Sequence, residues 1–436
     1  FNLTFNYDFR IIFMIKYQVH KFSNGLRLLM VPSKEAHSFK FTVIVKTGSD
    51  YETRSNNGIS HFLEHMCFKG TKKRPSNFSI SQELDEVGGS YNAFTSREIT
   101  GYWAKVSDYH FKKTIDITSD IFMNSVFRES DIEKEKQVIK EEINMYLDDP
   151  KEKVWDNFFG LLYGNQPAGW PVLGPKENIL RFTRKDLTKY RLSQYRAKSV
   201  VLIVSGNFKA RDVISLVKDY FKDIPKGKAK EKVKTKEKQT KPQLSLEYKK
   251  TDQTHLRLGV RGINLFDHRR YALHVLDTIL GGGMSFRLWQ LVREKLGAAY
   301  YISSFISSAT DRGLWGISSG IDNERAYLII SEILKEWKKL KEEVISPQEI
   351  KKAKENIRGN MLLLTENIHL IAEYYAFDLL YRNKIETMDQ SLTKILKVTS
   401  SDLNKLANDL LKPNNLNLAI IGPFKDRQKF LQILKI

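Results

Sequence analysis

Two histidines and a glutamate within five residues form the part of the sequence best suited to chemistry. His61 and His65 are four residues apart on an expected helix over 59–68, so both imidazoles project from one face and can bind one ion. Glu64 lies on the adjoining turn, where it can stay off the metal and accept a proton from a metal-bound water. Zinc lowers the pKa of such a water toward about 7. The pattern therefore predicts metal-assisted hydrolysis of a peptide bond, with Glu64 as the general base.

A third protein ligand is needed if one position on the zinc is to remain for water. The run EKEKQVIKEE offers four carboxylates, those of Glu133, Glu135, Glu141 and Glu142. Glu135 and Glu142 are two helical turns apart and share a face, whereas Glu141 lies about 100° away from Glu142. We take Glu142 as the third ligand and Glu135 as a carboxylate that orients a ligand or supports catalysis. Without the histidine motif, an exposed charged helix face would be the better interpretation of this run.

The order H-x-x-E-H is the inverzincin signature, and its surroundings resemble a known family. Three segments carry the resemblance to the pitrilysin/insulinase family of zinc peptidases: HFLEHMCFKGT (61–71), GGSYNAFTSREITGYW (88–103) and EKQVIKEEINMY (135–146). The chain looks most like the mitochondrial-type processing peptidases and their bacterial relatives. The resemblance implies that His61, His65 and Glu142 hold one zinc ion per chain, that Glu64 is the general base and that Glu135 assists.

The same resemblance assigns roles to five residues outside these ligands. In LVREKLGAAYY, Arg293 and Tyr300 match a family pair that reaches the substrate carbonyl and the developing oxyanion. Asn92, Ala93 and Phe94 match an edge strand to which the substrate adds as an extra β-strand. Taken alone, the first two would be solvated surface residues, and Asn92 would be a turn residue at the start of a strand.

The order of expected elements repeats along the chain, which favours a duplicated fold. Strands are expected at 17–20, 26–32, 39–47, 90–95, 99–106, 197–205 and 255–261, and helices at 59–68, 79–87, 109–124, 130–147, 210–221 and 270–280. LGAAY (296–300) echoes VGGSY (87–91), and GLW (313–315) echoes GYW (101–103). The repeat favours an α+β fold of two homologous domains. By resemblance, each domain has a mostly antiparallel sheet covered by helices, and the two domains form half of a clamshell chamber.

The expected domains are residues 15–224, which carry the zinc site, and residues 244–436, which contribute Arg293 and Tyr300. In the second domain, His274, Asp277 and Thr278 stand where the first has its H-x-x-E-H motif. Asn360 stands at the position of Glu142. Because one imidazole and the distant carboxylate are missing, we expect no metal site there.

Between the two expected domains lies a lysine-rich linker, residues 225–243. The segment 226–241 holds eight lysines and two glutamates, a net +6 of the chain's +20. Its low apolar content predicts a flexible connection that packs no core. The net charge could suggest a nucleic-acid partner, but no recognition motif accompanies it, so we expect none.

The remaining composition indicates a soluble protein of ordinary type. Apolar residues make up 41% of the 436, charged residues 28%, and no apolar run is long enough for a membrane helix. Cys67, the single cysteine, excludes a disulfide within the chain. Residues 1–13 make a poor signal or transit peptide, so a cytoplasmic location is expected, and a second hypothesis starts translation at Met14.

These observations lead to one expected function and three alternatives. We expect a zinc endopeptidase, and the resemblance implies that it hydrolyses unfolded peptides in an enclosed chamber that a homodimer closes. The first alternative is a presequence-processing peptidase with the same chemistry and a narrower substrate range. The second is a catalytically silent structural subunit, and the third, based on charge alone, is a nucleic-acid binder.

Overall fold

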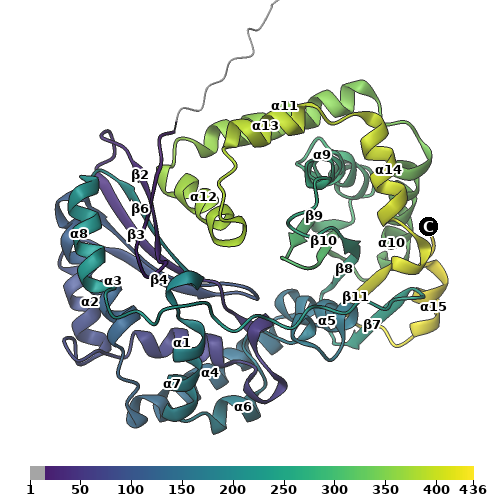
Figure 1. Ribbon diagram of the computed structural model, residues 1–436. Helices are drawn as coiled ribbons and strands as arrows, with labels where there is room; N and C mark the ends of the chain where they lie inside the picture. Colours follow the sequence, from purple (N-terminus) through teal and green to yellow (C-terminus); the bar gives the residue numbers. More distant parts are fainter. Residues whose placement is uncertain (1–14) are drawn as a thin grey trace, which may run out of the picture.

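The computed structural model describes residues 15–436, and Figure 1 shows two β-sheets in separate lobes with helices packed against each. The α+β fold expected from the sequence is confirmed, and both sheets are mostly antiparallel. The N-terminal segment 1–14, with the hypothetical start at Met14, lies outside the described residues.

The first sheet has six strands in the order β1-β2-β6-β3-β5-β4. They are β1 (Gln18–Lys21), β2 (Arg27–Pro32), β3 (Ser38–Val45), β4 (Ser90–Thr95), β5 (Thr100–Ser107) and β6 (Val200–Gly206). Every residue of β6 is buried, as its β-branched run VVLIVSG predicts for a central strand. Strand β6 pairs parallel with β2 and antiparallel with β3, whereas β4 pairs only with β5 and forms an edge.

The second sheet repeats this arrangement without an equivalent of β1. Its order is β7-β11-β8-β10-β9. The strands are β7 (Gln243–Tyr248), β8 (Gln253–Gly262), β9 (Ala299–Ser308), β10 (Gly313–Asp322) and β11 (Asn417–Gly422). Here β11 pairs parallel with β7 and antiparallel with β8, as β6 does with β2 and β3. The shared pairing pattern supports the duplication inferred from the sequence, although the expected domain boundaries remain a prediction.

Among the described residues, eight α-helices precede β7 in the sequence, and seven follow β8. The first group is α1 (Ile59–Cys67), α2 (Asn77–Asp85), α3 (Phe111–Asn124), α4 (Glu129–Asp148), α5 (Pro150–Tyr163), α6 (Lys176–Arg181), α7 (Arg184–Gln194) and α8 (Ala210–Tyr220). The second is α9 (Arg270–Gly281), α10 (Ala326–Glu342), α11 (Pro347–Leu364), α12 (Ile368–Arg382), α13 (Met388–Leu396), α14 (Ser400–Leu410) and α15 (Arg427–Ile433). The expected elements are present, with ends that differ by at most three residues.

Two helices cross between the halves of the chain. Helix α5, from the first half, packs on β8 and β11 of the second sheet, where Phe158 and Leu162 join Ala419 and Ile421 in one core. Helix α12, from the second half, packs on β2 and β6 of the first sheet, where Tyr375 is fully buried. Figure 1 shows both helices beside the sheet of the other half. Each half therefore supplies apolar cover to the other.

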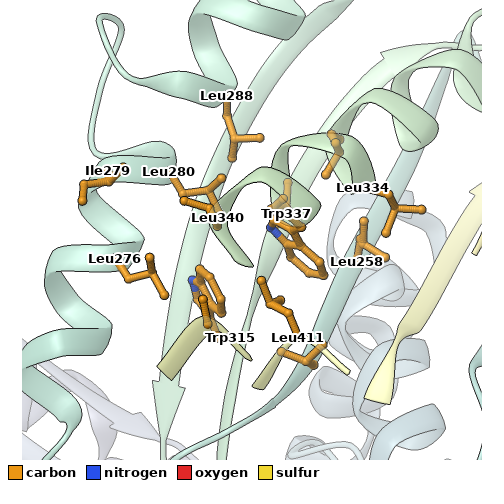
Figure 2. Packing of buried hydrophobic residues seen from close by; sticks show 14 of the residues in the cluster. Leu258, Leu276, Ile279, Leu280, Leu288, Trp315, Leu334, Trp337, Leu340 and Leu411 are labelled. Carbon is orange, nitrogen blue, oxygen red and sulfur yellow. The ribbon is translucent and has the colours of Figure 1, made fainter. Parts of the chain in front are cut away.

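The largest apolar core lies in the second lobe between β8, β10 and the helices that cover them. Trp315 and Trp337 stack with ring centroids 5.8 Å apart, among leucines such as Leu258 and Leu340 (Figure 2). This core fixes α9, because Trp315 Nε1 donates a hydrogen bond to Asp277 Oδ1 at 2.9 Å.

The lysine-rich segment joins the lobes without helix or strand between Pro225 and Pro242. It differs from the flexible connection expected, because side chains and amides near its centre bond both lobes. Thr235 N donates to Asp311, and Lys236 N donates to Gln166. Over residues 15–436, the structure has no helix that is both long and apolar enough to cross a membrane.

Candidate metal centre

Helix α1 begins at a position that requires glycine. Its N-cap residue, Gly58, has φ 99°, and a Cβ atom there would lie 2.6 Å from the Leu173 carbonyl oxygen. The buried Glu52 carboxylate accepts hydrogen bonds from Gly58 N and Ser60 N, both at 2.8 Å, and from Asn57 Nδ2 at 2.9 Å. These contacts satisfy amides that a helix start leaves unpaired, and they fix the position of α1.

The opposite face of α1 is buried in the first lobe. Phe62, Leu63 and Met66 have no exposed surface, and Cys67 is buried with them, as expected for a core cysteine. Apolar burial therefore fixes the rotation of the helix and leaves the motif's polar side chains on the other face.

The structure brings His61, His65 and Glu142 together, from helices α1 and α4. The two Nε2 atoms are 3.2 Å apart. Glu142 Oε1 lies 3.7 Å from His61 Nε2, and Glu142 Oε2 lies 3.5 Å from His65 Nε2. Among residues 15–436, these three are the one group of His, Cys, Asp or Glu side chains with ligand atoms close enough to share an ion.

The spacing of these atoms fits a zinc ion. Tetrahedral zinc with Zn–N and Zn–O bonds near 2.0–2.2 Å separates neighbouring ligand atoms by about 3.3–3.5 Å. The carboxylate distances of 3.5 and 3.7 Å are too long for good hydrogen bonds to the imidazoles. Burial lowers the pKa of His61 to about 3, so this imidazole is neutral near pH 7, the form that binds metal. Three electron-pair donors thus converge where a cation would satisfy all of them.

Glu135 contacts the second histidine at Nδ1, the ring nitrogen that does not face the other ligands. Its Oε1 lies 2.8 Å from His65 Nδ1, and its Oε2 lies 2.5 Å from Lys69 Nζ. Burial alone would lower the pKa of His65, but the hydrogen bond to Glu135 and the charges of Glu142 and Glu64 raise it. Lys69 was not expected at this site, and its spacing of four residues from His65 is the only sequence signal for it.

Glu64 lies beside the ligands with a free carboxylate oxygen. Its Oε2 is buried and has no hydrogen-bond partner within the described part of the chain. Burial raises the pKa of Glu64, and the neighbouring charge of Glu142 adds to this shift. A carboxylate with a raised pKa and an unused oxygen is suited to accept a proton.

The predicted substrate strand lies at the edge of the first sheet, next to α1. Asn92, Ala93 and Phe94 belong to β4, which pairs with β5 on one side only. Asn92 is exposed, and its Oδ1 accepts a hydrogen bond from Ala93 N at 2.8 Å. Phe94 packs over Gly101, where a Cβ would lie 2.4 Å from its ring. The outer edge of β4 therefore pairs with no other strand of the described chain, and the Asn92 side chain occupies its Ala93 amide.

Arg293 and Tyr300 lie in the second lobe, at the π-helical turn η6 (Trp289–Lys295) and the start of β9. Arg293 Nη1 donates to the carbonyl oxygens of Ala299 at 2.7 Å and Tyr300 at 3.0 Å, and the Tyr300 side chain is exposed. Among the described residues, neither side chain forms a hydrogen bond or ion pair with the three ligand side chains. Within one chain, the structure does not bring this pair to the metal centre.

Comparison with known proteins identifies the family. The family model described as Insulinase (Peptidase family M16) matches residues 27–176, and the model described as Peptidase M16 inactive domain matches residues 181–357. The chain belongs to the pitrilysin/insulinase family of peptidases, M16. The resemblance noted from the sequence is therefore confirmed.

Relatives and solved structures agree with this assignment. The chain is 36% identical to the "uncharacterized zinc protease YmxG" of Bacillus subtilis, over 92% of this chain and 97% of the relative. It is 33% identical to an "uncharacterized zinc protease" of Rickettsia bellii, over 93% and 98% of the two chains. A protease from Helicobacter pylori superposes with a TM-score of 0.87 at 25% identity, over 94% and 99% of the chains. A Pseudomonas fluorescens structure described as a peptidase M16 inactive domain has the same fold, with a TM-score of 0.86 at 18% identity over 95% and 100%.

Proposed function

We propose that this chain is a zinc-dependent endopeptidase that hydrolyses unfolded peptides, with one zinc ion held by His61, His65 and Glu142. The carrying observation is the convergence of two imidazole nitrogens and a carboxylate within 3.2–3.7 Å of one another. Relatives named zinc proteases support the same metal and the same reaction class.

Glu64 is the proposed general base. When bound, zinc supplies a Lewis acid that polarises the peptide carbonyl and lowers the pKa of a water molecule. The free Oε2 of Glu64 takes a proton from that water as its oxygen bonds to the carbonyl carbon. Glu64 then gives the proton to the leaving amine nitrogen as the carbon–nitrogen bond breaks. Glu135, through its hydrogen bond to Nδ1, holds the His65 ring with Nε2 toward the ion.

Strand β4 is the proposed binding edge for the substrate. An extended peptide that displaces Asn92 Oδ1 from the Ala93 amide can pair with Asn92, Ala93 and Phe94 through main-chain hydrogen bonds, which depend little on substrate sequence. An unfolded peptide has free main-chain groups for this pairing, whereas a folded protein has few. Strand pairing at β4 therefore favours unfolded peptides as the substrate class.

A second copy of the chain is the proposed source of the remaining active-site groups. In the described part of the chain, Arg293 and Tyr300 form no hydrogen bond or ion pair with the metal ligands, and a homodimer that places them at the other copy's site would supply them. This can be tested by mixing Glu64→Gln with Arg293→Ala, each inactive alone. Random exchange between dimers would restore about a quarter of the parent activity if the site is shared, and none if it is not.

The main experiment combines zinc quantitation with hydrolysis of a quenched fluorescent peptide. Glu64→Gln should keep its zinc and lose activity by about 10²–10⁴-fold, the usual contribution of a general base. The matched control is Glu177→Gln, at an exposed glutamate on α6, and this variant should retain both its zinc and its activity. Equal activity in Glu64→Gln and the parent would refute the assigned base.

Two alternatives remain within the family. A presequence-processing peptidase would share this chemistry, and a cleavage-site profile on a peptide library would reveal its narrower specificity. A catalytically silent subunit is the second candidate, favoured by the fold shared with a structure described as an inactive domain. Purified protein that binds zinc but cleaves no peptide would support the silent subunit.

A further inference from the structure

Lys232 differs from every other lysine in the lysine-rich segment. Seven of the eight lysines between residues 226 and 241 are exposed, whereas the Lys232 side chain is only 9% exposed. The next residue, Val233, is 68% exposed. Hydrophobic burial alone would favour the opposite arrangement. Specific contacts therefore decide which side chain of this segment points inward.

These contacts are carboxylates from three separate segments. Lys232 Nζ lies 2.6 Å from Glu98 Oε1, 2.5 Å from Asp311 Oδ1 and 3.6 Å from Asp50 Oδ2. Asp50 lies in the 3-10 turn η1 (Ser49–Tyr51), Glu98 in the β4–β5 hairpin and Asp311 in the β9–β10 hairpin. A single ammonium group thus joins two segments of the first lobe to one of the second.

The surrounding groups depend on this charge. Arg312 Nη2 pairs with Asp50 Oδ2 at 2.7 Å, and Thr310 donates to Glu98 through both its amide and its hydroxyl. In the part of the chain that the structure describes, Lys232 is the only cation within ion-pair distance of Glu98. Removing the ammonium would leave a largely buried carboxylate without a counter-ion, which is costly.

The cluster of Lys232 with Asp50, Glu98 and Asp311 lies next to the segments that position the proposed active site. Ser49 N and Asp50 N donate to the carbonyl oxygens of Ser96 and Arg97, which follow directly after edge strand β4. Two residues after Asp50, Glu52 accepts hydrogen bonds from the amides that begin α1. The cluster therefore holds one end of the substrate strand and the approach to the metal-binding helix.

We infer that Lys232 is a positioning residue of the proposed peptidase, which fixes the β4–β5 hairpin and the approach to α1 against the second lobe. Its effect on catalysis rests on the proposed function. Its structural effect does not, because the contacts can be followed without any activity. Charge at this position is the essential property, so arginine should substitute for lysine and methionine should not.

The test uses the full-length zinc-loaded protein with Lys232→Met, Lys232→Arg and, as the matched control, Lys234→Met at an exposed neighbouring lysine. Hydrogen exchange is measured for peptides that cover residues 94–101 and 305–312. The rate at which trypsin cleaves the bond after Lys230 is measured as well. In Lys232→Met, exchange and cleavage should both rise by about tenfold or more, while zinc content stays at the parent level. Lys232→Arg and Lys234→Met should match the parent.

Kinetics separate positioning from a general loss of stability. Below the melting temperature of each variant, Lys232→Met should raise KM for an unfolded peptide by about tenfold, with a smaller change in kcat, because the substrate strand is displaced. Adding Glu98→Gln to Lys232→Met should restore most of the lost affinity, because it removes the unpaired charge. If Lys232→Met behaves like Lys234→Met in exchange, cleavage and KM, the inference is wrong. If the parent hydrolyses no peptide, the proposed function fails, while exchange and trypsin cleavage still decide whether Lys232 holds the hairpins.

Discussion

Phe158→Ala offers a direct test of the exchange of helices between the two lobes. Phe158 belongs to α5, in the first half of the chain, yet its fully buried side chain packs on the second sheet. Its ring lies against Gly259 of β8, where a Cβ atom would come within 2.6 Å of Phe158 Cζ. Truncation to alanine removes this contact and leaves a cavity between the lobes.

The expected loss of stability follows from this burial. Replacing a buried phenylalanine by alanine costs about 3–5 kcal/mol of unfolding free energy. The matched control is Phe78→Ala on α2, because Phe78 is 72% exposed and its loss should cost within about 0.5 kcal/mol. Since α5 and α12 each cover the other half's sheet, we expect the loss in Phe158→Ala to appear in both lobes.

Urea unfolding with hydrogen exchange at β3 and β8 measures this coupling. Both strands should lose protection together in Phe158→Ala. Gly259→Ala should also destabilise, by about 1–3 kcal/mol through overpacking. The double variant should lose less unfolding free energy than the sum of the two single losses, because the smaller residue at 158 makes room for the new methyl group. Loss of protection at β8 with β3 unchanged would refute the reasoning.

Three further predictions concern buried polar groups. Burial would raise the pKa of Glu386, but hydrogen bonds, first from Tyr271, lower it to about 2. The stabilising contribution of Glu386 is therefore present above the unfolded pKa near 4.5 and is lost as pH falls toward 2. Melting temperatures measured from pH 6 to pH 2.5 should fall less steeply in Glu386→Gln than in the parent. The thiol of Cys67 is buried with a raised pKa, so a thiol reagent should label it only in denaturant, and rapid labelling of the native protein would contradict its place in the core. Arg74 is buried against three carboxylates, so Arg74→Met should cost about 3–5 kcal/mol in urea unfolding. Lys73→Met, at a 58% exposed side chain, should cost under about 1 kcal/mol. Equal losses in the two variants would be inconsistent with the buried cluster.

Local patterns predicted most elements because their causes are local. Strand β4 occupies the expected residues 90–95, since Gly88 and Gly89 end the preceding helical segment and alternating side chains follow. Helix α1 ends at Cys67, one residue before the expected end. Its start was visible from the apolar spacing, but the buried cap by Glu52 joins residues whose pairing no periodicity reveals.

The candidate ligands were accessible from sequence for a similar reason. Four residues separate His61 from His65 on one helix, so their proximity follows from helical geometry alone. The approach of Glu142, from a different helix, depends on how α4 packs against α1, so helix periodicity could single out Glu142 as a candidate but could not show that it reaches the histidines. Lys69 beside Glu135 depends on the same packing and was missed.

Contacts between the lobes lay beyond sequence reasoning. The lysine-rich segment was expected to be free because its composition cannot pack an apolar core, yet Lys232 is held by charge. The crossing of α5 and α12 to opposite sheets also left no periodic signal, because an apolar face does not specify which sheet it covers.

Anomalous X-ray diffraction at the zinc edge, from crystals of the purified protein, tests the proposed metal centre most directly. We expect one peak per chain, within about 2.3 Å of His61 Nε2, His65 Nε2 and a Glu142 oxygen. A zinc peak elsewhere, or a Glu142 carboxylate turned away from an ion bound by the two histidines, would contradict the assignment.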